Sequence, residues 1–292
     1  LTSSSGTLTI NNGLTTGDLT TTDHRIRVQI IDSGTTTVAL VKNYKNNLFL
    51  DQPNTYSGGT TINGGRVESY GTPSFGSGAV VVANGAQAWL RANGTYPNNF
   101  TINGIGATEG GGNLGAIRFA GLATIAGTVN VATASRLTAY DSQDRGTITG
   151  PLTGSAALEK TGAGTIVISG DATGYTGALT VGAGTLGLRN NFGGSVVVAD
   201  NAGIAGEGLI SGDLTLGATA GAVLTVDGST AAALGAANLT VNGLTSVKLA
   251  GTPTGAAMDV VTYSGTLTLS GATLDENFAV VDATSYRGAP AF

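Results

Sequence analysis

The segment Arg136–Gly146 holds the densest group of side chains that could act as acids and bases. Asp141 and Asp144 lie close together in it, beside Tyr140 and Arg145. Because paired carboxylates serve as acid and base in glycoside hydrolysis, this segment raises the hypothesis of a polysaccharide-acting enzyme. The other interpretation is a charged solvent loop between two strands. We favour the loop, because no further acidic group can be placed beside this pair from the sequence.

Other residue types that carry catalysis are scarce. His24 is the only histidine, the chain has no cysteine, and no serine stands at the centre of a Gly-x-Ser-x-Gly motif. Gly-x-Gly-x-x-Gly matches begin at Gly110 and Gly182, but neither precedes a helical pattern that would offer its N-terminus to a phosphate. The glycine-aspartate repeat that binds calcium is also missing. We therefore predict no catalytic residue, no cofactor and no metal site.

One short segment suggests a binding surface rather than catalysis. In Ala86–Ala92 the residues alternate, so that Gln87, Trp89 and Arg91 share one face of an expected strand. We expect this polar face to point outward. Trp89 would then offer a ring on which a sugar could stack or a protein partner could dock. The alternative is that a neighbouring loop covers the ring.

Composition narrows the classes of protein that the chain can represent. It has 48 glycines, 41% hydrophobic residues, 11% charged residues and a formal net charge of -5. That much apolar surface can build a core, so the chain does not have the signature of disorder. The scattered basic residues predict no nucleic-acid partner. No long apolar run predicts direct membrane insertion, and no signal-like start opens the chain, so we expect any export signal to lie outside it.

The elements that must position these residues are short strands. Thr165–Ser169 places Ile166 and Ile168 on one face and Val167 on the other, and similar runs recur along the chain between glycine, asparagine and aspartate. No helical pattern separates them, which indicates an all-β protein. Asn-Gly turns keep a sandwich or barrel open as an alternative. We favour a parallel β-solenoid with coils of about 20 to 25 residues, forming one domain over 1–292.

A long internal repeat supports the solenoid. Residues 40–67 align with 158–186, so that Lys42 matches Lys160. With their downstream strands the two copies cover about 40–86 and 158–203. The further matched positions are Leu48, Leu50, Tyr56, Gly58, Thr61 and Ile62 in the first copy, and Ile166, Ile168, Tyr175, Gly177, Thr180 and Val181 in the second.

These positions resemble the passenger-associated repeat of Gram-negative autotransporters, the passengers of type Va secretion. The shared pattern is a lysine, a glycine-flanked strand, Asn-Thr-Tyr-Ser-Gly-Gly-Thr-Thr and Asn-Gly-Gly. The first copy departs from it by carrying Asn43, Asn46 and Asn47 in place of glycines, and the second by Gly177-Ala178. The resemblance implies a right-handed parallel β-helix at the cell surface or outside the cell.

The same resemblance implies a function and partners. The passenger would act as a rigid stalk or adhesin-like scaffold without enzymatic activity. It would meet a protein or glycan on a host or neighbouring cell, and its own translocator barrel would complete the full-length protein. That barrel is absent from this sequence, which shows no run of ten-residue alternating strands with aromatic girdles.

Two further expectations follow for the repeat. Tyr56 and Tyr175 stand just before glycine-rich corners, and we expect them to cover these corners rather than to bind a ligand. Leu158–Val226 has frequent short strands and few charges, whereas Leu1–Asp51 is more irregular. Stacked coils stabilise their neighbours. We therefore expect the C-terminal half to be the more stable one, and to act as a folding template if it emerges first, as the resemblance implies.

Overall fold

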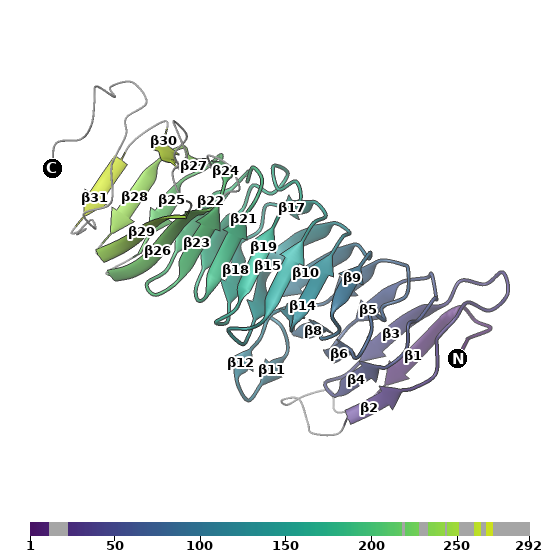
Figure 1. Ribbon diagram of the computed structural model, residues 1–292. Coiled ribbons are helices and arrows are strands. Elements are labelled where there is room, and N and C mark those ends of the chain that lie inside the picture. Colours follow the sequence, from purple (N-terminus) through teal and green to yellow (C-terminus); the bar gives the residue numbers. More distant parts are fainter. Residues whose placement is uncertain are drawn as a thin grey trace.

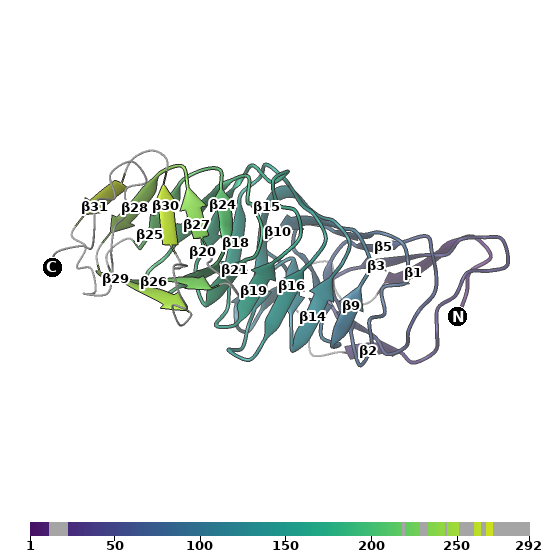
Figure 2. The same cartoon turned by 45° about the horizontal axis from the view of Figure 1, so that its top comes forward.

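The computed structural model describes residues 1–11, 23–217, 220–227, 233–242, 244–250, 260–263 and 267–270. Every regular element in this part of the chain is a strand. The strands wind into an elongated rod, and the chain advances along it from one end to the other (Figures 1 and 2). All strand pairs are parallel except one small hairpin. The predicted all-β parallel β-helix is confirmed, and the sandwich or barrel alternative is wrong.

Parallel ladders of strands form the faces of the rod. One consists of β2 (Asp23–Ile26), β4 (Asn47–Leu50), β6 (Gly65–Ser69), β8 (Ala86–Leu90), β13 (Ile117–Phe119), the C-terminal part of β15 (Val129–Ala139), β18 (Leu158–Thr161), β20 (Ala178–Val181), β22 (Ser195–Val198), β25 (Leu214–Leu216), β28 (Leu239–Asn242) and β31 (Leu267–Ser270). A second consists of β1 (Thr7–Asn11), β3 (Ala39–Asn43), β5 (Thr60–Ile62), β7 (Val80–Val82), β10 (Phe100–Gly104), the N-terminal part of β15 and β17 (Leu152–Gly154). The long strand β15 therefore belongs to both ladders.

Two more ladders complete the later coils. One consists of β9 (Gly94–Tyr96), β14 (Leu122–Ile125), β16 (Arg145–Ile148), β19 (Thr165–Ile168), β21 (Thr185–Leu188), β23 (Gly203–Gly206), β26 (Ala220–Asp227) and β29 (Leu244–Ala250). The other consists of β24 (Gly208–Ile210), β27 (Ala233–Ala236) and β30 (Val260–Tyr263). The hairpin joins β11 (Thr108–Glu109) and β12 (Gly112–Asn113), and it protrudes from the rod near β8 (Figure 1).

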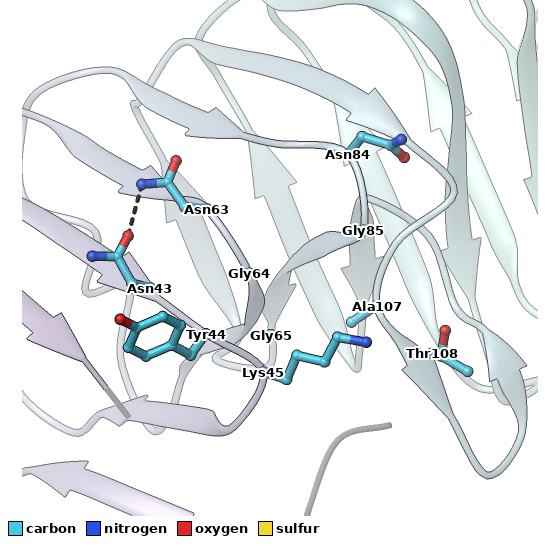
Figure 3. Close-up of a pocket in the computed structure, with 10 residues that line it drawn as sticks. All are labelled: Asn43, Tyr44, Lys45, Asn63, Gly64, Gly65, Asn84, Gly85, Ala107 and Thr108. Carbon is cyan, nitrogen blue, oxygen red and sulfur yellow. Dashed lines mark hydrogen bonds between the residues drawn. The ribbon is translucent and has the colours of Figure 1, made fainter. Parts of the chain in front are cut away.

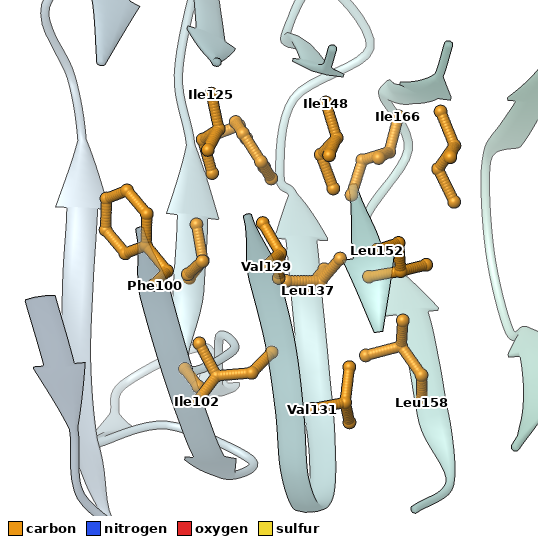
Figure 4. Close-up of a cluster of buried hydrophobic side chains, with 14 of the residues drawn as sticks. Phe100, Ile102, Ile125, Val129, Val131, Leu137, Ile148, Leu152, Leu158 and Ile166 are labelled. Carbon is orange, nitrogen blue, oxygen red and sulfur yellow. The ribbon is translucent and has the colours of Figure 1, made fainter. Parts of the chain in front are cut away.

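The core is a column of aliphatic and aromatic side chains inside the coils. Ile125 on β14 is the register partner of Ile148 on β16, and Ile148 is that of Ile168 on β19. Figure 4 shows Ile125 and Ile148 among the side chains of this core. Stacking like on like lets each coil bury its apolar face against the coils on either side, which is how a solenoid is stabilised. Ile166 and Ile168 point into this core as predicted. Val167 was expected on the outer face, but it is only 5% exposed, because it packs against Gly187 on the next coil.

The repeated tyrosines are buried at the corners. Tyr56 and Tyr175 are both fully covered, which confirms their expected structural position. The Tyr56 hydroxyl shares a 2.5 Å hydrogen bond with the hydroxyl of Thr60, and the Tyr175 hydroxyl lies 2.8 Å from the carbonyl oxygen of Ala156. A Cβ added at Gly177 would collide with the Tyr175 ring. The glycine is needed at this corner because the ring takes the space of its side chain.

Candidate functional site

One outer face of the rod gathers arginines and aromatic rings from successive coils. Arg25 on β2, Phe49 on β4, Glu68 on β6, Trp89 on β8 and Arg118 on β13 are register partners in one ladder. Parallel pairing sets neighbouring partners about 4.8 Å apart, so their side chains form a continuous column. We call this column and its flanking residues Arg66, Tyr70 and Arg91 the arginine–aromatic face.

Trp89 is the centre of this face. The guanidinium carbon of Arg118 lies 4.0 Å from a Trp89 ring centroid, that of Arg66 lies 4.4 Å away, and that of Arg91 lies 5.0 Å away. Each distance is within the range of a cation–π contact, which draws the cation toward the negative face of the ring. Three arginines thus share one indole, and the site concentrates positive charge around an aromatic surface.

The N-terminal end of the face repeats this arrangement. The guanidinium of Arg25 lies 4.2 Å from the Phe49 centroid and 4.6 Å from the Tyr70 centroid, and that of Arg91 lies 4.9 Å from the Tyr70 centroid. Asp51 accepts a 3.1 Å hydrogen bond from Arg25. Rings and guanidinium groups therefore alternate along several coils.

Two glutamates balance part of the charge. Glu68 is fully buried and pairs with Arg91 at 2.5 Å. Glu109 comes from the hairpin, and its Oε2 accepts from Arg66 at 2.7 Å and from Arg118 at 3.3 Å. Burial lowers the pKa of Arg118, and Arg66 lowers it further, whereas Glu109 acts against that shift. The guanidinium groups of Arg66 and Arg118 are thus held together by one carboxylate oxygen.

The structure separates the three residues that the sequence placed on a binding surface. Arg91 keeps 43% of its side chain exposed and Trp89 is half-buried. Gln87 is fully buried, because the chain after the hairpin lies over it and takes 3.1 Å hydrogen bonds from its Nε2 at the carbonyl oxygens of Leu114 and Gly115. The expectation that Gln87 is exposed is therefore wrong. A neighbouring loop, which was expected as the alternative to cover Trp89, covers Gln87 instead.

Sequence reasoning missed Arg66, Arg118 and Glu109. Each lies outside the segment that contains Trp89. Coil stacking brings Arg66 and Arg118 to the indole, and the hairpin brings Glu109 to both arginines. Arg66 could have been found by aligning consecutive coils, because that alignment places Gly65–Ser69 beside Ala86–Leu90. Nothing in the local pattern indicates that the hairpin brings Glu109 back across the face.

Asp144, one of the two aspartates of the enzyme hypothesis, stabilises a turn. Asp144 is only 9% exposed, and its two carboxylate oxygens accept from the backbone N–H groups of Gly121 at 2.8 Å and Asp141 at 3.0 Å. Arg136 pairs with Glu159 at 2.8 Å on the next coil. Both oxygens of Asp144 therefore accept from backbone N–H groups, which gives this carboxylate a structural role in the turn.

An open groove of about 560 Å³ lies at the corners beside the hairpin (Figure 3). Its residues are Asn43, Tyr44, Lys45, Asn63, Gly64, Gly65, Asn84, Gly85, Ala107 and Thr108. The carboxamides of the asparagines form a ladder, in which Asn63 donates to Asn43 at 2.8 Å and Asn43 donates to Asn11 at 2.7 Å. Gly65 and Thr108 precede Arg66 and Glu109, so the groove adjoins the arginine–aromatic face.

The described residues offer few other functional groups. His24 is exposed on β2. Within the described ranges no three histidine, aspartate or glutamate side chains gather as metal ligands would. The same ranges contain no helix long and apolar enough to cross a bilayer.

Comparisons with known proteins agree with the repeat. The family model of the passenger-associated-transport-repeat matches residues 40–68 and 158–188. The chain is 30% identical over 259 residues to the adhesin BmaC autotransporter of Brucella suis biovar 1 (strain 1330), an alignment that covers 77% of this chain and spans 7% of that relative. No solved structure matches. The two repeat matches, this identity and the parallel β-helix together identify the chain as a passenger segment of a Gram-negative autotransporter, located at the cell surface or outside the cell.

Proposed function

We propose that this passenger segment is a rigid stalk with an adhesin-like binding face and without enzymatic activity. The observation that carries the proposal is the arginine–aromatic face, where Trp89 and Tyr70 are interleaved with Arg25, Arg91 and Arg118 over successive coils. Aromatic and arginine side chains are the groups that dominate binding surfaces. The relative named as an adhesin supports the same role.

A stalk fits the architecture of the described coils. Parallel pairs continue without interruption from β2 to β31, and we propose that 1–292 forms one β-helical unit. In a solenoid each coil contacts mainly its neighbours, so the rod grows along one axis without splitting into domains. In the full-length protein it would hold its binding face away from the translocator barrel.

The partner would be a protein or a glycan on a host or neighbouring cell. The purified chain should be screened on a glycan array and, as coated beads, on cultured cells. Specific attachment that is lost in Trp89→Ala supports the proposal, provided that the variant keeps the circular dichroism of the parent. Beads that attach no better than beads coated with albumin contradict it.

We further propose that the C-terminal half aids export by folding first. Its coils repeat two four-residue strands each, such as β18 with β19 and β20 with β21, whose inward side chains are buried. By contrast, β1 has no buried residue. If the C-terminal coils emerge from the cell first, they give later coils an apolar layer on which to stack. This stacking favours movement of the rest of the chain out of the cell.

A further inference from the structure

The Glu109 carboxylate meets only some of the hydrogen-bonding groups of the arginine–aromatic face. Its Oε2 serves both Arg66 and Arg118, whereas its buried Oε1 has no hydrogen-bond partner among the described residues. Three buried donors around the indole also lack an acceptor there, namely Arg66 Nε, Arg118 Nε and Trp89 Nε1, and Gln87 Oε1 lacks a donor. Buried donors without acceptors cost free energy, so a larger acceptor group placed here would be better bound than Glu109.

The hairpin that carries Glu109 is short, and polar contacts tie it to the coils, namely the Glu109 ion pairs and a 2.6 Å hydrogen bond from Arg136 to the carbonyl oxygen of Asn113. β11 and β12 contain two residues each and pair only with one another. Gly110 in its tip and Gly112 at the start of β12 are exposed, and a Cβ added at either would meet no atom within 4 Å. Segments with few buried contacts open at low free energy. An incoming ligand therefore has a small structure to displace, in contrast to the stacked coils beneath.

Displacement of Glu109 changes the charge of the face. Arg66 and Arg91 would keep Glu68 as an ion-pair partner, whereas Arg118 would lose its ion pair and keep only the weaker influence of Asp144 and Asp141. The planar fork of a guanidinium matches a carboxylate, because it can donate two parallel hydrogen bonds. The group that best replaces the Glu109 side chain is thus another carboxylate, presented on a body that can stack against Trp89.

We propose that the arginine–aromatic face binds a carboxylate-bearing oligosaccharide, and that Glu109 occupies the carboxylate position until such a ligand displaces the hairpin. A sugar ring would pack on the exposed part of the Trp89 indole while its carboxylate joins Arg66 and Arg118. This inference rests on the proposed adhesin-like function and names the ligand class for that surface.

A sugar fits this face better than an acidic peptide. An extended peptide can bind by adding a strand to an open sheet edge, where main-chain hydrogen bonds supply much of its affinity. Here β6 and β13 pair with β8 on both sides, so the strand that carries Trp89 has no open edge. Recognition must come from side chains, and alternating rings and guanidinium groups suit a chain of sugar rings that carry carboxylates.

The test uses Trp89 fluorescence, which is specific because the chain has one tryptophan. The probes are a hexauronate, a neutral hexasaccharide and a hexaglutamate peptide, titrated into the whole chain. We expect the hexauronate to bind, and Glu109→Gln to tighten that binding about tenfold, because the internal competitor loses its charge. The matched control is Glu207→Gln, which removes the same charge between β23 and β24, away from the hairpin, and should change the affinity less than about twofold.

Three results would overturn the inference: equal effects of Glu109→Gln and Glu207→Gln, no binding of the hexauronate, or equally tight binding of the neutral sugar or the peptide. Failure of the proposed function is read separately from the coated beads. If the beads attach to cells but the hexauronate does not bind, the ligand class is wrong while adhesion stands. If the hexauronate binds but the beads do not attach, the site stands and the adhesive function is wrong.

Discussion

Lys42 and Lys160 occupy equivalent positions in the two repeat copies, and each is a buried bridge between coils. Lys42 Nζ donates to the carbonyl oxygens of Asn43, Tyr44 and Gly64 at 2.7, 2.7 and 3.0 Å. Lys160 Nζ donates in the same way to the carbonyl oxygens of Gly162, Gly164 and Ala183 at 2.8, 2.5 and 2.6 Å. One ammonium group thus ties the corner of its own coil to the next coil.

Removal of this bridge should destabilise the rod. In Lys160→Met the apolar stem is kept, but three carbonyl oxygens lose their donor, so we expect the free energy of unfolding to fall by about 2 to 4 kcal/mol. Lys45→Met is the control, because Lys45 lies along the open groove, and surface changes usually stay within about 0.5 kcal/mol. Urea unfolding followed by circular dichroism measures both. Equal losses in the two variants would show that the bridge has no special role.

The buried lysines also predict how stability depends on pH. Burial lowers the pKa of Lys42 and Lys160 to about 8, from 10.5 for a free lysine. Between these values the unfolded chain holds more protons than the folded chain, so the free energy of unfolding should rise with pH. Unfolding midpoints measured from pH 7 to pH 10 test this. A rise that persists undiminished in Lys160→Met would mean that other groups cause it.

Above about pH 10 the trend should reverse. Burial raises the pKa of Tyr96 to about 12 and also raises the pKa of Tyr56 and Tyr175. The folded chain then keeps protons that unfolded tyrosines release, so the free energy of unfolding should fall. Tyr175→Phe removes one of these groups, and it should reduce the steepness of the fall. An unfolding midpoint that continues to rise at pH 11 would contradict this role of the buried tyrosines.

The glycine after the second lysine bridge should resist substitution. Gly184 has a φ of +64°, and a Cβ there would collide with Lys160 Nζ and with the carbonyl oxygens of Gly162 and Gly164. We expect Gly184→Ala to cost at least about 2 kcal/mol, through backbone strain and loss of the bridge. Gly110→Ala is the matched control, because its Cβ would enter open space. Thermal unfolding separates the two variants, and a neutral Gly184→Ala would show that the corner can rearrange.

The fold could be predicted from the sequence because its signals are local and repeated. The inward positions Ile166 and Ile168 and the repeated Tyr56 and Tyr175 corners are readable within a few residues, and the structure buries these side chains as expected, although it buries Val167 as well. The lysines were aligned in the sequence, yet their role was not assigned. Their acceptors are backbone carbonyl oxygens on two coils, which a sequence does not display.

The binding face was only partly predictable. Alternation correctly separates Trp89 from the core positions Ala88 and Leu90. It cannot tell which outward side chains are covered, so it failed for Gln87, which a segment almost a whole coil later covers. Contacts between Trp89 and Arg118 depend on the length of the coil between them, which includes the hairpin.

The repeat equivalents Lys42 and Lys160 lie in different ladders, on β3 and β18, because β15 crosses from one ladder to the other.

The proposed stability gradient predicts a pattern of hydrogen exchange. Backbone amides in the described part of Leu158–Val226 should exchange more slowly than those in Leu1–Val67, because their coils bury regular apolar layers. Native-state exchange followed by mass spectrometry on the intact chain gives both rates in one experiment. Slowest exchange in the N-terminal segment would mean that the gradient runs in the opposite direction, against a C-terminal template.

The adhesin-like role is the central claim, and attachment of coated beads to cultured cells under flow tests it most directly. Beads that carry the intact chain should attach, and beads that carry Trp89→Ala should lose most of that attachment while the variant remains folded. Tyr140→Ala is a control, because this 42% exposed ring lies at the margin of the face and contacts only Arg118 among the face's arginines. It should keep most of the attachment. Equal attachment of the parent and the Trp89→Ala variant, or no attachment by the parent, would contradict the account.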